Sequence, residues 1–217
     1  MSDMLNRFAK FTTPTVSDAL DRLGIEGACL GIKPLDRSFH VLGHAFTLKY
    51  EATGISSKGT VGDYIDDVEP GKVIVIDNAG RLDCTVWGDI LTTVSSMKKI
   101  GGTVIDGVCR DTGHILQLDY PVFSRDSYMR TGKDRVQLEA VNVPVTISNI
   151  RVNPGDIIFG DSDGVLIIPQ EKAEDVLEVA DHIEQAESQI IDAIQNGMRL
   201  DEARKKFKYH QLQTKEL

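Results

Sequence analysis

Two short polar stretches hold the side chains best suited to chemistry. The first is Gly88-Asp89, which stands immediately before an apolar segment with helical spacing; the second is Arg110-Asp111, which ends the strand-like run VIDGVC. Twenty residues stand between Asp89 and Arg110. An arginine can hold a carboxylate through two hydrogen bonds and an aspartate can hold a cation, so the two stretches together could bind a small acid and a metal ion.

The position of Asp89 adds backbone donors to this site. Asp89 is expected at or near the N-cap of the helix that begins there, so the first amides of that helix, those of Ile90 and Leu91, would lack partners and point outward. In a strand-helix-strand unit the start of the helix and the carboxyl end of the next strand can lie at the same sheet edge. We therefore predict that these amides and Arg110 bind one carboxylate, and that Asp111 binds Mg²⁺, which commonly takes one or two protein carboxylates.

Both stretches also have purely structural interpretations. An adjacent arginine and aspartate most often form a solvated pair of little energetic consequence. An aspartate at a helix start most often serves only as its cap. Spacing alone leaves the functional and the structural interpretation open.

The elements that must position these residues alternate between strands and helices. Short β-branched runs bounded by Gly, Pro, Asn or Asp predict strands at residues 40–50, 72–78, 103–108, 145–152, 156–160 and 165–169. A helix that ends at Gly101 is predicted between the second and third strands, from an apolar stripe made by Ile90, Leu91, Val94, Met97 and Ile100. This strand-helix-strand unit implies a parallel strand pair and a right-handed crossover.

Helices are also predicted near both ends of the chain. The segment TPTVSDALDRLG (13–24) has apolar residues at helical spacing, with Thr15 or Ser17 as candidate caps and Gly24 as the stop. Residues 171–196 predict a helix of roughly 35 to 40 Å, long enough to pack on a neighbouring subunit. The stretch from about residue 200 to 217 is predicted to be a tail or a solvated helix end.

Length and composition limit the classes of function. We predict one domain, residues 1–217, because 217 residues with 41% hydrophobic content suit a single α/β core. A net charge of −9 argues against a nucleic-acid partner, since binding phosphate backbones needs a Lys/Arg excess. No signal sequence or apolar span is evident, so we expect a cytoplasmic protein without a membrane partner. Three cysteines without a CxxC pair indicate buried, reduced packing residues.

Five stretches together resemble the RraA-like family. They are TVSDALDRLG, LGHAFTL, TVWGDILTT, GGTVIDGVCRD and VNPGDIIFGDSDGVLIIP, in that order and over most of the chain. The family includes the 4-hydroxy-4-methyl-2-oxoglutarate/4-carboxy-4-hydroxy-2-oxoadipate aldolases and the regulators of ribonuclease E activity. The resemblance implies an α/β layered sheet-and-helix sandwich similar to the swivelling phosphohistidine domain, with a long C-terminal helix. It also implies a homotrimer or hexamer with sites between subunits.

In the aldolase branch the pattern Asp-x20-Arg-Asp carries the chemistry. The resemblance implies that Asp89 and Arg110 are catalytic and that Asp111 anchors Mg²⁺ (or Mn²⁺). Pyruvate would be held by Arg110 and the loop residues Gly88, Asp89, Ile90 and Leu91. The implied activity is that of a divalent-metal-dependent class II pyruvate aldolase, which cleaves a 4-hydroxy-2-oxo acid and also decarboxylates oxaloacetate. A metal held there would stabilise the enolate, and Asp89 is our candidate for proton transfer at the substrate's alcohol.

One position departs from the family pattern. Active aldolases of the family tend to have a Glu or Asp three residues after the metal aspartate, where this chain has His114. His114 could orient a metal-bound water or be a satisfied structural histidine. Glu184 and Glu187 on the long helix resemble the acidic residue that a neighbouring subunit lends to the family's site, although a solvated helix face is the simpler interpretation.

Two further motifs have competing interpretations. The segment GDSDGV (160–165) is predicted to be a tight turn between two strands rather than a carboxylate cluster with a chemical role. Trp87 could wall the substrate pocket or simply pack in the core.

Two classes of function follow. The first is the metal-dependent lyase acting on a small 2-oxo acid. The alternative is a non-enzymatic RraA-type regulator that binds a ribonuclease through an acidic surface. The complete set Asp89, Arg110 and Asp111 favours the lyase.

Overall fold

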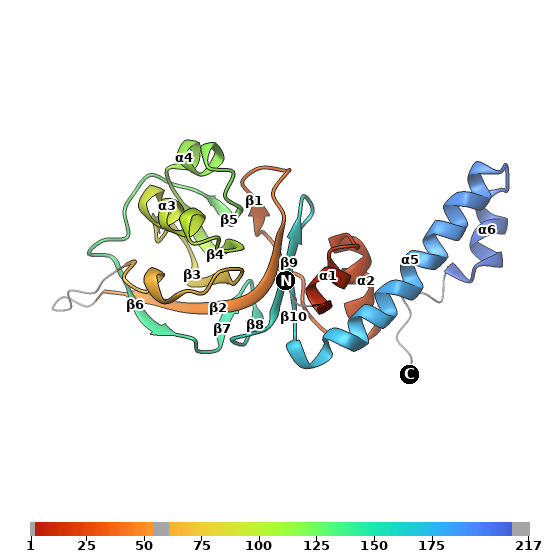
Figure 1. Cartoon of the computed structure of the whole chain (residues 1–217), viewed down its shortest axis with the longest axis horizontal. Helices are drawn as coiled ribbons and strands as arrows, with labels where there is room; N and C mark the ends of the chain where they lie inside the picture. The colour runs from red at the N-terminus through yellow and green to blue at the C-terminus, as the bar shows by residue number, and fades with distance from the viewer. Residues whose placement is uncertain (1–2, 54–60, 210–217) are drawn as a thin grey trace. The chain divides into compact units, whose positions relative to one another are not determined.

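The computed structural model describes residues 3–53 and 61–209 (Figure 1). The chain forms two compact units, which we call the helical unit (Met1–Gly27 with Glu171–Leu217) and the sheet unit (Ala28–Gln170). Together they confirm a mixed α/β fold with a long C-terminal helix. The predicted likeness to the phosphohistidine domain and the predicted single domain stay predictions.

The sheet unit is built on an eight-stranded sheet of order β1-β5-β4-β3-β2-β9-β10, in which β6 pairs with β2. The strands are β1 (Lys33–Pro34), β2 (Val41–Ala52), β3 (Val73–Thr85), β4 (Gly102–Cys109), β5 (Val122–Ser127), β6 (Val136–Val141), β9 (Ile157–Asp161) and β10 (Gly164–Ile168). The four strands β2, β3, β4 and β5 are parallel, and the outer pairings are antiparallel. A separate ribbon consists of β7 (Val145–Ile147) and β8 (Ile150–Val152).

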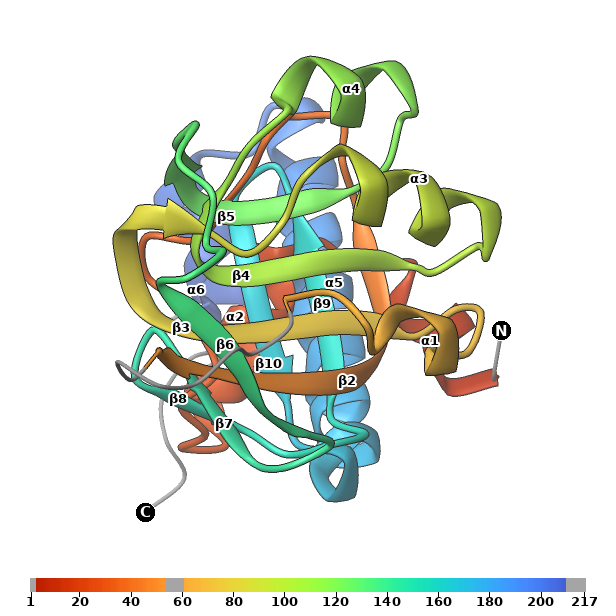
Figure 2. The ribbon, with the colours of Figure 1, turned by 90° about the vertical axis from the view of Figure 1, so that its left-hand side faces the viewer.

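Two short helices lie on one side of this sheet. They are α3 (Asp89–Met97) and α4 (Thr112–Gln117), and Figure 1 shows both above β2 and β3 while β7 and β8 lie below β2. Figure 2 shows β5, β4, β3 and β2 side by side in this order. The 3₁₀ turns are η1 (Ile65–Asp67) and η2 (Gln170–Lys172). The predicted strand-helix-strand unit is β3-α3-β4 with parallel strands. A second such unit, β4-α4-β5, follows it and was not predicted.

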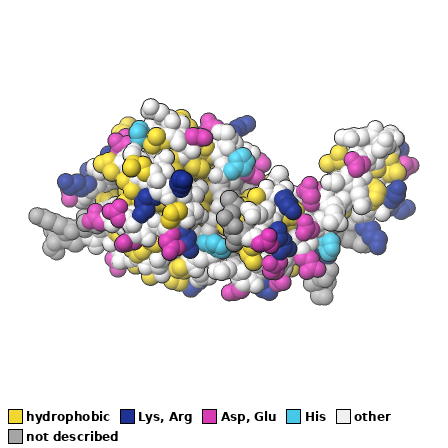
Figure 3. Space-filling model, viewed as in Figure 1, with side chains coloured by type: hydrophobic (Ala, Val, Ile, Leu, Met, Phe, Trp, Pro, Cys, Tyr) yellow, Lys and Arg dark blue, Asp and Glu magenta, His cyan; other side chains and the backbone are white. Residues whose placement is uncertain are grey.

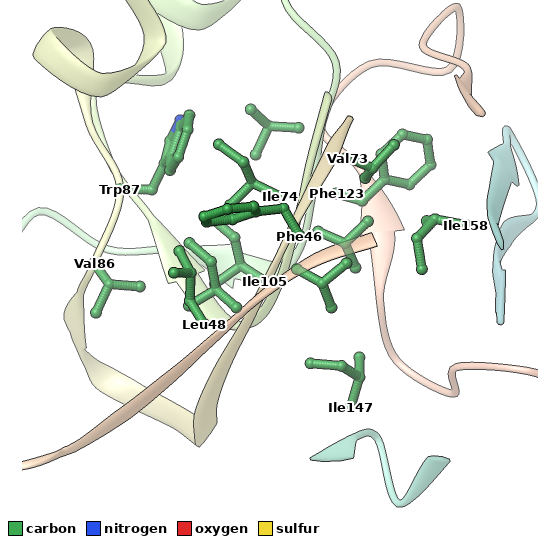
Figure 4. Packing of buried hydrophobic residues seen from close by; sticks show 14 of the residues in the cluster. Phe46, Leu48, Val73, Ile74, Val86, Trp87, Ile105, Phe123, Ile147 and Ile158 are labelled. Atoms are coloured by element: carbon green, nitrogen blue, oxygen red, sulfur yellow. The ribbon is translucent and has the colours of Figure 1, made fainter. Parts of the chain in front are cut away.

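The core explains why the predicted strands are strongly apolar. All eight residues of β4 are buried, as expected for a central parallel strand covered on both faces. Figure 4 shows Leu48, Ile74 and Ile105, from three adjacent strands, gathered in this core. Cys29, Cys84 and Cys109 are buried and free, which confirms their interpretation as reduced packing residues.

The helical unit contains α1 (Asp3–Phe8), α2 (Thr13–Arg22), α5 (Ala173–Gln195) and α6 (Leu200–Lys206). Helix α5 has 23 residues, or about 35 Å, and buries an apolar stripe that includes Val176, Leu177 and Ala180. Helix α6 occupies the start of the predicted tail, and residues 210–217 lie outside the described residues. None of the described helices combines the length and the apolar character that a membrane crossing requires.

Two local predictions were wrong. The N-cap of α2 is Thr12 rather than Thr15 or Ser17, because Pro14 in the first turn favours an earlier start. Residues 145–152 form the hairpin β7-β8 instead of one strand, since Ser148 and Asn149 at its centre both have positive φ, 50° and 69°.

The turn predicted in GDSDGV is confirmed. Asp161 pairs with Gly164 in the hairpin β9-β10, and the Asp163 amide donates to Asp161 Oδ1 at 2.9 Å. The Asp161 carboxylate therefore serves the turn.

Candidate active site at the start of α3

The start of α3 carries the first predicted site residues. Gly88 is the N-cap and Asp89 is the first helical residue, close to the predicted position. The Asp89 amide donates to Asp111 Oδ2 at 3.1 Å, and the Ile90 amide donates to Asp89 Oδ1 at 2.8 Å. The prediction of a free Ile90 amide was therefore wrong, because the neighbouring carboxylate folds back over it. The Leu91 amide has no bonding partner within the described part of the chain.

The α3 stripe is also narrower than predicted. Ile90 and Met97 are 74% and 79% exposed, while Thr92 and Ser95 are buried. Thr92 can face the core because its hydroxyl donates to Gly88 O at 2.8 Å and accepts from Trp87 Nε1 at 2.9 Å. Ile90 is thus left at the surface beside the site.

Arg110 and Asp111 meet Asp89 at this point. Arg110 Nε lies 3.3 Å from Asp111 Oδ2, and both side chains are 37% exposed. The Arg110 amide donates to Trp87 O at 3.0 Å, which holds the end of β4 against the approach to α3. Asp111 adopts a left-handed conformation (φ 56°, ψ 39°) as the N-cap of α4, a geometry that aspartate tolerates better than most residues. One Asp111 oxygen thereby accepts from the Asp89 amide and forms an ion pair with Arg110.

Gly88 permits this close approach. A Cβ on Gly88 would lie 2.6 Å from Asp111 Oδ2 and 3.2 Å from Arg110 Nε. Its φ of −161° is ordinary extended backbone, so space rather than conformation requires glycine here.

A cavity of about 410 Å³ opens beside these residues, a volume within the usual range for small-molecule sites. Its lining includes Gly88, Asp89, Ile90, Leu91 and Arg110 together with Val61, Gly62, Asp63, Thr85, Val86, Trp87, Thr131 and Lys133. The predicted substrate-binding residues therefore lie together on one wall. A second hollow of about 310 Å³ borders Arg110 and Asp111 from the side of Tyr128 and Met129.

Trp87 both packs and borders the cavity. Its side chain is 1% exposed and its ring stacks on Tyr120 with centroids 6.0 Å apart. Figure 4 shows Trp87 beside the core side chains. The two interpretations of Trp87 are therefore compatible.

Asp63, Thr131 and Lys133 complete the cavity wall and were not predicted. They come from the loops before η1 and before β6, where the sequence marks only polar turns. Their place depends on contacts between distant segments: the Thr85 amide donates to Arg130 O at 2.9 Å, and Thr85 forms an isolated bridge with Thr131.

His114 joins α4 to α3. Its Nε2 lies 2.9 Å from Thr93 Oγ1, and that hydroxyl donates to Asp89 O at 2.9 Å. Because the single hydroxyl hydrogen is donated to the carbonyl, Nε2 must be the donor to Thr93. His114 is therefore hydrogen-bonded to Thr93, which in turn is hydrogen-bonded to the backbone carbonyl of Asp89.

Glu184 and Glu187 belong to the helical unit. Glu184 accepts from Thr15 Oγ1 at 3.5 Å. Partial burial and the negative charges of Asp18 and Glu184 raise the pKa of Glu187. Their predicted role toward a neighbouring subunit stays a prediction.

The carboxylates near α3 limit which metals fit. Over residues 3–53 and 61–209 no cluster of three or more His, Cys, Asp or Glu side chains could hold a metal ion. The described residues of a single chain therefore do not fit a tetrahedral zinc site. Mg²⁺ or Mn²⁺ does fit, because Asp111 is half-exposed and a hard cation can complete its shell with waters and substrate oxygens.

Known proteins resemble this chain over most of its length. A family model described as RraA-like, Aldolase/RraA, matches residues 13–167. Protein DlpA of Legionella pneumophila is 41% identical over 215 residues, which cover 97% of this chain but only 35% of DlpA, so this chain spans about a third of that relative. A protein of Halalkalibacterium halodurans named "Putative 4-hydroxy-4-methyl-2-oxoglutarate aldolase" is 35% identical over 82% of each chain.

Solved structures agree with this assignment. An uncharacterized protein from Pseudomonas syringae pv. tomato superposes with a TM-score of 0.86 at 42% identity, covering 93% of this chain and 96% of the other. RraAS2 of Streptomyces coelicolor, described as an unusual member of the RNase ES inhibitor RraA protein family, superposes with a TM-score of 0.79 at 25% identity, covering 87% and 95%. This chain belongs to the RraA-like family.

Proposed function

We propose that this protein is a divalent-metal-dependent class II pyruvate aldolase that cleaves a 4-hydroxy-2-oxo acid and also decarboxylates oxaloacetate. The observation that carries the proposal is the convergence of Asp89, Arg110 and Asp111 at the start of α3. Asp89 and Arg110 line the cavity of about 410 Å³, and Arg110 and Asp111 line the neighbouring hollow of about 310 Å³. The name of the Halalkalibacterium halodurans relative supports the same class of substrate.

Asp111 is the residue that would hold the metal, Mg²⁺ or Mn²⁺. Its Oδ2 accepts from the Asp89 amide and forms an ion pair with Arg110, and no bond to Oδ1 is found in the described residues. A bound divalent cation supplies Lewis-acid polarisation of the substrate's 2-oxo group. No lysine that forms a Schiff base is required.

Arg110 would bind and orient the 2-oxo acid. Its side chain is 37% exposed at the cavity wall. The N–H groups of a guanidinium can donate to both oxygens of a carboxylate, or to one carboxylate oxygen and the neighbouring 2-oxo oxygen. The free Leu91 amide adds a backbone donor at the same helix start. Arg110 then offsets the negative charge that develops on the C2 oxygen when the C3–C4 bond breaks.

Asp89 would move the proton. Its Oδ1 is occupied by the Ile90 amide, which fixes the carboxylate and leaves Oδ2 to take the proton of the substrate's 4-hydroxyl. The C3–C4 electron pair then moves into the C2–C3 bond, C4 becomes a carbonyl, and the enolate is protonated at C3 to give pyruvate. Oxaloacetate loses CO₂ from the same C3–C4 bond and needs no such base.

We also propose that the protein works in the cytoplasm as a homotrimer or hexamer on small 2-oxo acids, with no nucleic-acid or membrane partner. The net charge of −9 supports the absence of a nucleic-acid partner. Ile90 and Met129, 74% and 76% exposed, are the apolar side chains beside the site that a neighbouring subunit would cover. That neighbour would lend Glu184 or Glu187, and light scattering on the purified chain tests the assembly.

A non-enzymatic regulator of a ribonuclease is the second candidate. The description of the Streptomyces coelicolor structure favours it, as does the net negative charge. On the face drawn in Figure 3, however, acidic and basic side chains are interspersed, which does not single out one acidic docking area.

A pyruvate assay separates the two candidates. The full chain is incubated with 4-hydroxy-4-methyl-2-oxoglutarate or oxaloacetate, and pyruvate is followed through lactate dehydrogenase with Mg²⁺ and with EDTA. Metal-dependent pyruvate release supports the lyase and shows that His114 is compatible with it. No release from either substrate contradicts the proposal and favours the regulator.

A further inference from the structure

His114 of α4 and Thr93 of α3 form a hydrogen-bonded bridge beside the proposed site. His114 Nε2 donates to Thr93 Oγ1 at 2.9 Å, and the Thr93 hydroxyl donates to the backbone carbonyl of Asp89 at 2.9 Å. Among the described residues no other side-chain hydrogen bond joins α3 to α4, which Figure 1 shows next to each other. The bridge therefore connects the first turn of α3 with α4 through one pair of side chains.

These two helices begin at the two carboxylates of the proposed site. Asp89 is the first residue of α3, and Asp111 is the N-cap of α4. The position of α4 is fixed by Ile115, which is completely buried, and by the His114 amide, which donates to Asp111 O at 2.9 Å. The ring of His114 therefore links the backbone of Asp89 to the same turn that presents Asp111.

The bridge holds Asp89 without using any group that is proposed to contact the substrate or the metal. The Ile90 amide donates to Asp89 Oδ1 at 2.8 Å, which orients the carboxylate within α3 but not relative to α4. The Asp89 amide donates to Asp111 Oδ2 at 3.1 Å, but that bond uses the carboxylate proposed to bind the cation. The contact between His114 and Thr93 is independent of both bonds.

We propose that His114 is a positioning residue, which through Thr93 places Asp89 at the substrate's 4-hydroxyl and so favours aldol cleavage over decarboxylation. This inference rests on the proposed function. In aldol cleavage the 4-hydroxyl proton passes to Asp89 Oδ2, the C3–C4 electron pair enters the C2–C3 bond, and C4 becomes a carbonyl. Oxaloacetate breaks its C3–C4 bond with loss of CO₂ and transfers no such proton. A displaced Asp89 should therefore slow aldol cleavage alone.

The test compares the two reactions in variants of the bridge. The full chain with Mg²⁺ is assayed for pyruvate from 4-hydroxy-4-methyl-2-oxoglutarate and from oxaloacetate. Thr93→Val keeps the shape of the side chain and removes its hydroxyl, and His114→Ala removes the other partner. Each is expected to lower kcat for aldol cleavage about 10- to 100-fold at unchanged KM, because a slightly misplaced catalytic group costs this much. Decarboxylation should be nearly unchanged, and Thr93→Ser, which keeps the hydroxyl, should retain most of both activities.

A double variant and a distant histidine show whether the two side chains act together. If they form one bridge, Thr93→Val combined with His114→Ala should lower kcat for aldol cleavage no further than either change alone. His40→Ala removes an exposed histidine of the sheet unit, whose Nδ1 lies 2.8 Å from Ser38 O, and it should leave both reactions unchanged. Equal loss of both reactions in Thr93→Val, no loss in either, or additive losses in the double variant would overturn the assignment of His114.

A nuclear magnetic resonance measurement separates this inference from the aldolase proposal. In mildly alkaline buffer the ¹⁵N spectrum of the His114 ring should show the neutral tautomer protonated at Nε2, and Thr93→Val should shift the Nε2 resonance. The tautomer protonated at Nδ1 would contradict the bridge whatever the activity. If the parent chain releases no pyruvate from either substrate, the aldolase proposal fails, and the role of His114 in positioning the base fails with it. If pyruvate is released but kcat is unchanged in Thr93→Val, only the inference on His114 is wrong.

Discussion

Two arginine-aspartate pairs flank the carboxyl end of β4, and they differ in burial and in hydrogen bonding. Arg110 and Asp111 are each 37% exposed, and only Oδ2 of the carboxylate is bonded in the described residues. Asp106, within β4, is 5% exposed; its Oδ1 accepts from Arg125 Nε and its Oδ2 accepts from the Ser148 amide at 2.9 Å.

The difference indicates which pair can take part in binding. The Asp106 carboxylate is fully used in joining β4, β5 and the β7-β8 turn, so changing its partners would leave a buried charge unsatisfied. The Asp111 carboxylate is open to solvent and can exchange Arg110 for another partner at small cost. Similar residue types therefore serve binding at one place and stability at the other.

Arg110→Ala is expected to have the largest effect on activity. Pyruvate release should fall at least about 10³-fold, because the variant loses the donor that orients the acid and offsets the developing charge. The free energy of unfolding should change by less than about 1 kcal/mol, since the pair is solvated. The coupled assay and urea unfolding check the two results. Unchanged turnover would contradict the assignment of Arg110.

Asp106→Ala is expected to show the opposite pattern. Removing the carboxylate leaves the Arg125 guanidinium and the Ser148 amide without their acceptor, at a cost of about 2–4 kcal/mol in the free energy of unfolding. Asp106→Asn keeps one acceptor oxygen and should lose less. Urea unfolding measures both variants. A loss below about 1 kcal/mol in Asp106→Ala would show that the two pairs do not differ as described.

Gly88→Ala tests how closely the exposed pair must be packed. The added Cβ would displace Asp111 Oδ2, which would lie 2.6 Å away, and so shift the carboxylate by a fraction of an ångström. Misplacement of this size is expected to lower kcat/KM about 10- to 100-fold. Gly113→Ala in α4 is the matched control, since its Cβ would meet nothing within 4 Å. Equal activity of the two variants would show that the close approach of Gly88 to Asp111 is not needed for catalysis.

The parts of the fold that could be predicted are those with long apolar runs. Strand β4 is predictable from its short β-branched run, and all eight of its residues are buried in the structure; α5 is predictable because its apolar stripe persists over 23 residues. Strand β5 was missed because its second half, Arg125 to Ser127, is polar, and α4 because six residues are too few to show helical spacing. The β7-β8 hairpin was missed because two adjacent positive φ angles leave the apolar pattern uninterrupted.

The site was predictable where it depends on one strand-helix-strand unit. Asp89, Arg110 and Asp111 flank consecutive elements, so the topology alone brings them to one sheet edge. Lys133 could not be found this way, because its place depends on a contact between the loop before β6 and β3. These two segments lie about 50 residues apart in the chain, and no sequence pattern indicates that they meet. The occupied Ile90 amide depends on one side-chain rotamer of Asp89, which sequence does not reveal.

Glu187 differs from Asp106 and Asp111 in that its neighbouring charges, those of Asp18 and Glu184, are negative. Partial burial, Asp18 and Glu184 raise its pKa above the ordinary value for glutamate of about 4.3. The folded chain therefore binds this proton more tightly than the unfolded chain does, so this contribution to stability is fully present below the unfolded pKa and is lost as pH rises through the folded pKa.

Glu187→Gln should consequently raise the urea midpoint at pH 7, with a gain of about 0.2–0.5 kcal/mol in the free energy of unfolding from the Glu184 pair alone. The gain should shrink toward pH 4 and in a Glu184→Gln background. A gain that does not depend on pH would mean that packing, rather than charge, is responsible.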